Sequence, residues 1–228
     1  MRKLVWALVA VVVVALLGFF VAPWVYGTFI AEDDAPAATV STEGAEAATG
    51  TLDGEWAVVA GTGPNRTAAG YTVHEILRGA DVTVVGSTDR VTGAATIVDG
   101  SLTAAEVVVE VDGITTDSGQ RDNQFRTRVM DTANFPTATF LLTEPVDLSS
   151  VPTDGTTGTV TVTGTLTLRG EERPVTVDVE VLRSGEDIVA SGSVPTTWTD
   201  FGVEPPDLGF VTVDDAGSVD FLVTLEKQ

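Results

Sequence analysis

The sequence has 228 residues, of which 33 are acidic and 12 basic, and its formal net charge at neutral pH is −21. Such an acidic surface repels phosphate backbones, so we do not expect nucleic acid as a partner. The chain contains no cysteine, which excludes disulfide bonds, thiolate metal sites and cysteine nucleophiles.

Residues 1–30 predict a transmembrane anchor. The run Leu4–Ala22 contains nineteen residues without a polar side chain, and as a helix it would span roughly 28 Å, about the thickness of a bilayer core. Arg2 and Lys3 precede this run, which indicates a cytoplasmic N-terminus, and aromatic residues follow it as in an interfacial belt. The sequence therefore predicts a single-pass protein of the cell membrane with an extracytoplasmic domain.

A cleaved signal peptide is the alternative interpretation of this segment. The hydrophobic region of a signal peptide has only ~7–15 residues, which is shorter than this run. Small residues at 35–37 offer a cleavage site, although acidic residues precede them. With either interpretation, the rest of the chain lies outside the cytoplasmic membrane.

Residues 31–50 predict a disordered acidic linker. Alanine, threonine, glycine, proline and acidic residues dominate this segment, and large apolar residues are nearly absent. A segment of this composition cannot bury enough surface to offset its chain entropy. We therefore expect a flexible tether between the anchor and a folded domain at 51–228.

Residues 51–228 predict consecutive β-strands separated by short turns. Apolar and polar residues alternate along most of them, as in strands with one apolar and one solvated face, and Gly, Asp, Pro and Ser mark the turns. We expect 81–87 and 92–98 to form a hairpin pair. The predicted strands are 54–59, 71–78, 81–87, 92–98, 101–114, 136–143, 159–168, 174–183, 187–194 and 218–226.

The segment Asp117–Phe140 interrupts this pattern and predicts a helix laid across one end of the β-structure. Residues 121–130 favour a helix, and Asp122 can accept from free N–H groups at its start. Phe125 and Val129 are four residues apart and share one side of that helix. Pro136 forces the preceding residue into an extended conformation, so a strand begins there.

About eight to nine strands with short turns fit either a barrel or a tightly packed sandwich. In a barrel, the apolar faces would share a lumen that is either filled or wide enough for one slim ligand. The inner faces are mostly small aliphatic residues, which favours a lumen with unfilled space. The predicted lumen residues are Val107, Val109, Val111, Phe125, Phe140, Leu142, Val160, Val162, Leu166, Leu168, Val175, Val177, Val179, Phe221 and Val223.

Several motifs in this region resemble those of the YceI-like family, lipocalin-like polyisoprenoid-binding proteins of bacteria. The resemblance extends over about residues 54–227, and the spacing of the Arg-Asp pair and the Phe-Pro motif is its most specific part. The motifs are Thr116-Asp117, Arg121-Asp122, Phe125-Arg126, Met130-Asp131, Phe135-Pro136-Thr137-Ala138-Thr139-Phe140, the run 163–170, the run 174–177 and Asp200-Phe201-Gly202-Val203.

This resemblance implies an all-β fold, an eight-stranded antiparallel lipocalin-like barrel with a short capping helix. It also implies a long isoprenoid chain, as in quinones and polyprenyl lipids, held in the lumen, and no catalytic activity. The N-terminal segments are similar to those of membrane-anchored actinobacterial members. We therefore expect an isoprenoid-lipid carrier, with a non-enzymatic envelope interaction or stress-response module of dry core as the alternative.

Polar residues on or beside the predicted helix are candidates for contact with a lipid head group. Arg121, Asp122 and Arg126 are expected at the mouth of the barrel, and the alternative is that they only cap the helix and close the barrel end. His74 is the only histidine, and no second histidine, cysteine or carboxylate cluster supports a metal site. We expect no metal and no cofactor apart from a bound isoprenoid quinone or polyprenyl lipid.

Overall fold

A computed structural model describes residues 34–77, 79–207, 209 and 211–228. The predicted anchor lies outside these residues, and among the helices that the structure does describe, none is long and apolar enough to cross a membrane. The strands are β1 (Gly54–Val59), β2 (Ala68–Leu77), β3 (Ala80–Thr88), β4 (Val91–Val98), β5 (Ser101–Glu110), β6 (Thr137–Leu142), β7 (Val146–Asp147), β8 (Thr157–Leu168), β9 (Glu171–Ser184), β10 (Asp187–Thr197) and β11 (Val211–Lys227).

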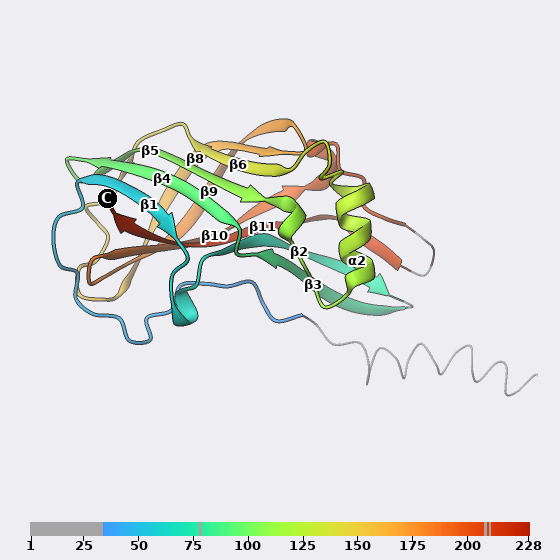
Figure 1. The fold of residues 1–228 in the computed structure, drawn as a ribbon, viewed down its shortest axis with the longest axis horizontal. Helices are drawn as coiled ribbons and strands as arrows, with labels where there is room; N and C mark the ends of the chain where they lie inside the picture. The colour runs from blue at the N-terminus through green and yellow to red at the C-terminus, as the bar shows by residue number, and fades with distance from the viewer. Residues whose placement is uncertain (1–33, 78, 208, 210) are drawn as a thin grey trace, which may run out of the picture.

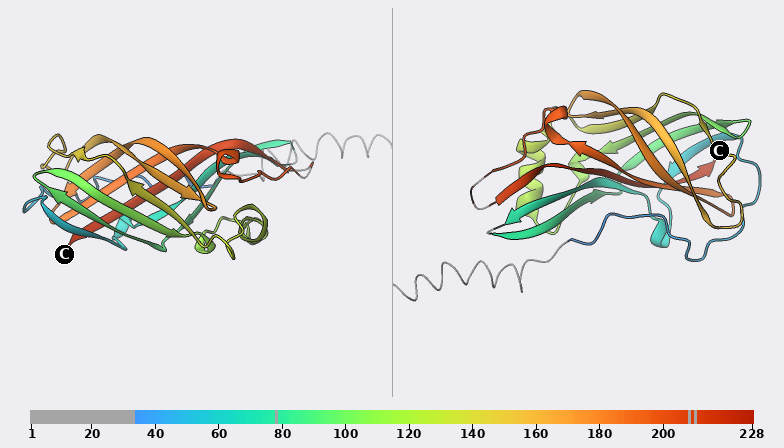
Figure 2. Two further views of the ribbon diagram at one scale, coloured as in Figure 1. Left: turned by 90° about the horizontal axis from the view of Figure 1, so that it is seen from above. Right: turned by 180° about the vertical axis from the view of Figure 1, so that it is seen from behind.

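These strands form a closed antiparallel barrel with eight positions among the described residues (Figures 1 and 2). β1 and β2 share one position, β3 and β4 share the next, and β5, β6, β8, β9, β10 and β11 follow in chain order. The long strand β11 closes the barrel, because its first part pairs with β2 and its last part pairs with β1. The expected eight-stranded antiparallel barrel is confirmed.

The alternation in the sequence explains which face of each strand is buried. In β8, the side chains at 160, 162, 166 and 168 are buried, whereas those at 159 and 161 are exposed. β9 repeats this pattern with buried residues at 177, 179 and 181. A closed barrel directs every second side chain of each strand inward, so this two-residue period is sufficient to assemble one core.

Two predictions about strands are wrong. Residues 81–87 and 92–98 do not pair with each other, because β3 pairs with β2, and β4 pairs with β1 and β5. A two-residue hairpin turn of the favoured types requires positive φ angles, and neither Asp89 nor Arg90 has one. The strand predicted over 101–114 ends at Glu110, where a 3-10 turn over Val111–Gly113 begins.

Residues 34–50, expected as part of a disordered linker, lie against the outside of the barrel instead. Val40 N–H donates to Ser191 Oγ at 3.1 Å, and Thr49 N–H donates to the Gly185 carbonyl at 2.7 Å. Val40 and Ala45 cover an outward-facing apolar cluster of Leu182, Val189 and Leu222, in which both leucines are 0% exposed. Two small apolar side chains and a few backbone hydrogen bonds thus order a segment of unfavourable composition.

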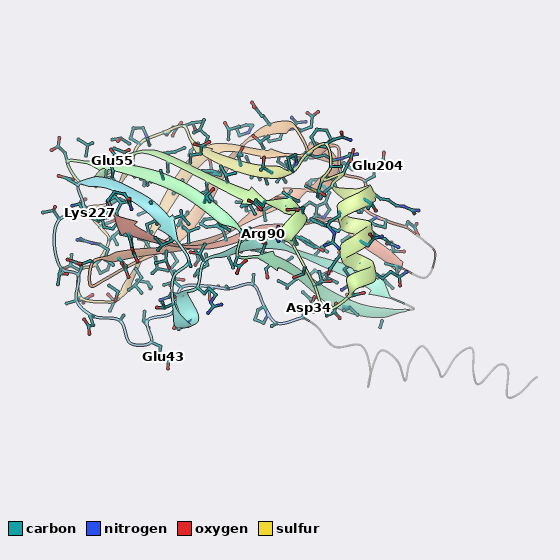
Figure 3. All side chains as sticks on the ribbon, in the orientation of Figure 1. Asp34, Glu43, Glu55, Arg90, Glu204 and Lys227 are labelled. Atoms are coloured by element: carbon teal, nitrogen blue, oxygen red, sulfur yellow. The ribbon has the colours of Figure 1, made fainter. Side chains whose placement is uncertain are left out.

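We call this segment the strap. It begins beside the capping helix and runs along the barrel toward the opposite end, as Asp34 and Glu43 show in Figure 3. At its start, Asp34 N–H donates to the Thr83 carbonyl at 3.0 Å, and the Asp34 carboxylate accepts from Val85 N–H at 2.9 Å. Asp34 therefore pairs with the edge of β3.

The helix expected between β5 and β6 caps one end of the barrel (Figures 1 and 2). It comprises α2 (Gly119–Gln124) and a π-helical turn over Phe125–Val129. It begins two residues earlier than the predicted run, because Ser118 is the N-cap and its hydroxyl accepts from Arg121 N–H at 3.4 Å.

Candidate functional site

The barrel interior is filled at the end distant from α2. Val146 of β7 and the loop residues Leu148 and Val151 are buried there with Trp56 and Ile97 in one hydrophobic cluster. The indole N–H of Trp56 donates to the Leu52 carbonyl at 2.8 Å, which fixes that ring. Because a loop enters this end of the barrel, its aliphatic side chains find packing partners.

Under α2 the interior is hollow. A cavity of about 320 Å³ lies there, partly open to solvent, and its lining is mainly aliphatic and aromatic. β2, β5 and β11 contribute the wall, and α2 and residues 198–206 contribute the cover. The lining residues are Ala69, Gly70, Tyr71, Val73, Glu75, Val84, Val109, Val111, Ile114, Ser118, Gln120, Arg121, Gln124, Phe125, Val129, Met130, Ala138, Leu168, Trp198, Val203, Pro205, Pro206, Val211, Val213 and Val219.

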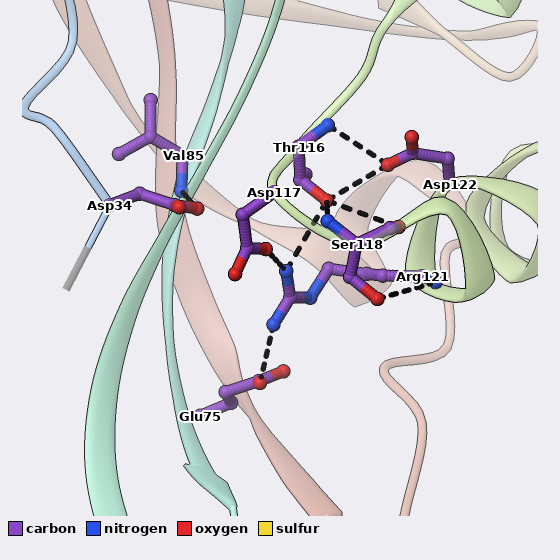
Figure 4. A network of polar contacts seen from close by, with 8 residues as sticks. All are labelled: Asp34, Glu75, Val85, Thr116, Asp117, Ser118, Arg121 and Asp122. Atoms are coloured by element: carbon purple, nitrogen blue, oxygen red, sulfur yellow. Dashed lines mark hydrogen bonds and ion pairs between the residues drawn. The ribbon is translucent and has the colours of Figure 1, made fainter. Parts of the chain in front are cut away.

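The charged part of this lining is an ion pair between the helix and β2 (Figure 4). The guanidinium of Arg121 lies 3.0 Å from a carboxylate oxygen of Glu75, which is 5% exposed. A second nitrogen of the same guanidinium contacts Asp117 and donates to Thr116 Oγ1 at 3.2 Å. One cation is therefore balanced by two carboxylates at the edge of an apolar cavity.

These contacts fix the protonation state of Arg121. Burial lowers the pKa of a guanidinium, but hydrogen bonds and charge attraction from Glu75 and Asp117 outweigh burial and raise the pKa of Arg121 above its ordinary value. Arg121 therefore stays charged at every physiological pH. The carboxylates of Glu75 and Asp117, rather than solvent, orient the N–H groups of its guanidinium.

Tyr71 lies deeper along β2 than Glu75 and faces the same cavity. Its ring stacks on Phe125 with 5.1 Å between the ring centroids and 15° between their planes. Burial raises the pKa of Tyr71 far above its ordinary value, against the opposing attraction of Arg121. Its hydroxyl, which has no hydrogen-bond partner among the residues that the structure describes, is therefore a neutral donor and acceptor.

The three residues expected at the mouth have different surroundings. Arg121 lines the cavity. Asp122 is buried behind the lining, where its carboxylate accepts from Thr116 N–H at 2.9 Å and Thr116 Oγ1 at 2.8 Å. Arg126 is half-buried in the π-helical turn and is not part of the cavity lining. The two hydrogen bonds from Thr116 to Asp122 hold the loop before α2 in place.

The predicted lumen residues all lie in the interior clusters of the barrel, but few of them border the cavity. Val109, Val111, Phe125 and Leu168 line it. The others pack in the filled interior or directly behind the lining: Val107, Phe140, Leu142, Val160, Val162, Leu166, Val175, Val177, Val179, Phe221 and Val223.

Several lining residues were not predicted from the sequence. Tyr71, Val73 and Glu75 alternate on β2 and face the cavity together, and this two-residue period is the signal that could have found them. Trp198 and Val203 lie in and beside a 3-10 turn, where no periodicity applies. Among the described residues, no group of three or more His, Asp or Glu side chains is arranged to hold a metal ion.

A closed antiparallel barrel with a helix over an apolar cavity defines a lipocalin-like binding fold. The chain belongs to the YceI-like domain family, whose profile matches residues 62–225.

Two curated relatives illustrate this similarity. A UPF0312 protein of Vibrio cholerae (strain ATCC 39315) is 34% identical over 113 residues, which cover 46% of this chain and 56% of that protein. A UPF0312 protein of Shewanella denitrificans is 30% identical over 123 residues, which cover 51% of this chain and 59% of that protein. The chain thus spans little more than half the length of these relatives.

Solved structures share the fold at lower identity. A polyisoprenoid-binding domain from Saccharophagus degradans, implicated in plant cell wall breakdown, superposes with a TM-score of 0.58 at 18% identity and covers 76% of this chain and 98% of that chain. BcnA of Burkholderia cenocepacia superposes with a TM-score of 0.56 at 19% identity and covers 69% of this chain and 95% of that chain.

Proposed function

We propose that this protein is a non-enzymatic carrier that holds the chain of an isoprenoid lipid in the cavity under α2. The cavity itself carries this proposal, because its volume and lining fit the apolar chain of a small ligand. Membership of the YceI-like family and the barrel shared with a polyisoprenoid-binding domain support it.

The driving force is burial of the chain. Each Å² of apolar surface removed from water contributes about 25 cal/mol. The side chains of Val73, Val84, Val109 and Val111 offer only apolar contacts to a ligand. The cavity discriminates little between apolar chains of similar width, so specificity depends on the polar groups at its edge.

We propose that the head group is neutral, as in a quinone, a quinol or a free prenol. The charge of Arg121 is already balanced by Glu75 and Asp117. A polyprenyl phosphate would bring further negative charge next to these two carboxylates, which is unfavourable where solvent screening is weak. A carbonyl or hydroxyl can instead accept from Arg121 or Gln124 and exchange a hydrogen bond with Tyr71.

We further propose that the N-terminal segment tethers the domain to the outer side of the cytoplasmic membrane. Asp34, the first residue of the strap, pairs with β3 beside Val84, which lines the cavity. The chain that leads to the predicted anchor thus starts at the hollow end of the barrel. A short tether there places the cavity close to the bilayer that supplies an isoprenoid lipid.

The test is lipid extraction from the purified full-length protein. Ala138→Trp fills the cavity from β6 with an indole, whereas Thr137→Trp places the same indole on the exposed neighbouring position. We expect mass spectrometry of organic extracts to find an isoprenoid lipid with the wild type and Thr137→Trp, and at least tenfold less with Ala138→Trp. Equal lipid content in both variants, or none in any preparation, would refute the carrier function.

A further inference from the structure

Two phenylalanines form the layer of side chains directly behind the cavity. Ala138 on β6 and Val219 on β11 line the cavity. Alternate residues of a strand share a face, so Phe140 and Phe221, two residues further along the same strands, also face the interior. Both pack against the hydrophobic core that fills the rest of the barrel.

Each ring occupies space that a glycine of the neighbouring strand leaves free. Phe221 pairs with Gly192 of β10, and a β-carbon on Gly192 would lie 2.9 Å from Cζ of the Phe221 ring. On the other side, a β-carbon on Gly164 of β8 would collide with the ring of Phe140. Two glycines therefore leave room for two large rings to lie against the neighbouring strands inside the barrel.

Beyond these rings the interior contains buried valines. Val160, Val162, Val177 and Val179 are buried in the same cluster as both phenylalanines. The cavity volume of about 320 Å³ is near the lower end of ligand pockets, which begin at about 300 Å³. Only a short stretch of an isoprenoid chain can fit above the rings.

We propose that Phe140 and Phe221, in the layer directly behind the lining, form a floor that stops the cavity from extending further and thereby set how many isoprene units the protein can bury. This inference rests on the proposed function and gives it a chain-length limit. Units beyond the limit remain outside the barrel and contribute no further burial. Affinity should therefore rise with each isoprene unit up to the floor and then stay level.

The experiment compares prenols of increasing length with the full-length protein in lipid nanodiscs. Geraniol, farnesol, geranylgeraniol and a long all-trans polyprenol differ only in their number of isoprene units. Trp198 lines the cavity, so the change in its fluorescence, corrected with a Trp198→Phe variant, reports binding inside the barrel. For the wild type, we expect affinity to rise about tenfold or more per buried unit and to level off among the shorter prenols.

Shortening either ring should deepen the cavity. In Phe140→Ala and Phe221→Ala we expect the plateau, the prenol length at which affinity stops rising, to move to a prenol longer by at least one isoprene unit. That longer prenol should raise the melting temperature of the variant more than it raises the melting temperature of the wild type. Phe140→Leu and Phe221→Leu, which disturb folding less, should shift the plateau in the same direction by less. Leu142→Ala, which removes a side chain one layer further behind Phe140, serves as the matched control and should leave the plateau in place.

The possible results separate the two proposals. If no prenol of any length binds the wild type, the carrier function falls, and the floor falls with it. If prenols bind but the plateau stays in place in the folded alanine and leucine variants, or moves equally in Leu142→Ala, only the floor is refuted. Affinity in the wild type that continues to rise up to the long polyprenol also refutes the floor.

Discussion

The two ends of the barrel are built by the same alternation of residues, yet one is packed and the other is hollow. At the packed end, the connection between β6 and β8, which contains β7, inserts Val146, Leu148 and Val151 among the strand residues. At the hollow end, α2 lies across the opening, and the apolar side chains that reach the cavity from its helical segment are Phe125, Val129 and Met130. A loop that enters a barrel fills it, whereas a helix laid over a barrel leaves space beneath.

The ends also differ in the side chains that cover or line them. At the packed end, the strap adds cover on the outside, where Val40 and Ala45 bury Leu182 and Leu222. At the hollow end, an ion pair and a buried tyrosine face the interior. Stability and ligand contact are therefore concentrated at opposite ends of one small domain, and substitutions should separate them.

The largest contrast is expected for two leucines on β8. Leu166 is 4% exposed and lies in the packed interior, whereas Leu168 is 5% exposed and lines the cavity. Leu166→Ala creates a new void and should lower the free energy of unfolding by about 4 kcal/mol, whereas Leu168→Ala enlarges existing space and should lower it by about 2 kcal/mol. Urea denaturation measures both values, and equal losses would contradict the division of the interior.

A smaller loss is expected when the ion pair at the hollow end is broken. Arg121→Gln leaves Glu75 with its side chain 6% exposed and without its cation. We expect a loss of about 2–3 kcal/mol, below the value for fully buried pairs because the Arg121 side chain is 22% exposed. Arg128→Gln, an exposed change on the same helix, should stay within about 0.5 kcal/mol. Similar denaturation midpoints for the two variants would show that the pair does not stabilise this end.

Much of the fold could be predicted from alternation alone. The two-residue period in β8 and β9 marks the inward side chains, and the helix-prone run after Asp117 marks the cap. The link between β3 and β4 could not be predicted in this way, because a pattern of apolar residues does not specify backbone angles. The ordering of the strap could not be predicted from the sequence, because its two small apolar side chains are buried only against a patch that three distant strands form in the folded barrel.

The site was less predictable than the fold. Arg121 was found from its place in a motif, whereas its partner Glu75 is 46 residues away and is brought to it only by the register of β2 and the position of α2. The depth of the cavity was also not predictable. It depends on which rings contact a glycine of the neighbouring strand, and that contact exists only in the folded barrel.

The strap offers a way to test whether the packed end depends on its outer cover. Val40→Asp places a charge against Leu182 and Leu222 and should lower the free energy of unfolding by about 1–2 kcal/mol. Thr39→Asp adds the same charge at an exposed neighbouring position and should change stability by no more than about 0.5 kcal/mol. If chemical denaturation gives the same result for both, the strap does not contribute to the stability of this end.

The smallest effect concerns Tyr71 at the hollow end and appears only at high pH. Burial raises the pKa of Tyr71 in the folded protein above its ordinary value of 10.0, so the folded state binds the phenolic proton more tightly than the unfolded state. This contribution to stability is complete below about pH 10 and is lost as pH rises further. At pH 11 the wild type should therefore have lost about 1 kcal/mol relative to Tyr71→Phe. Denaturation of both proteins between pH 8 and pH 11 measures this difference, and parallel curves would mean that the hydroxyl is as accessible to water as in the unfolded chain.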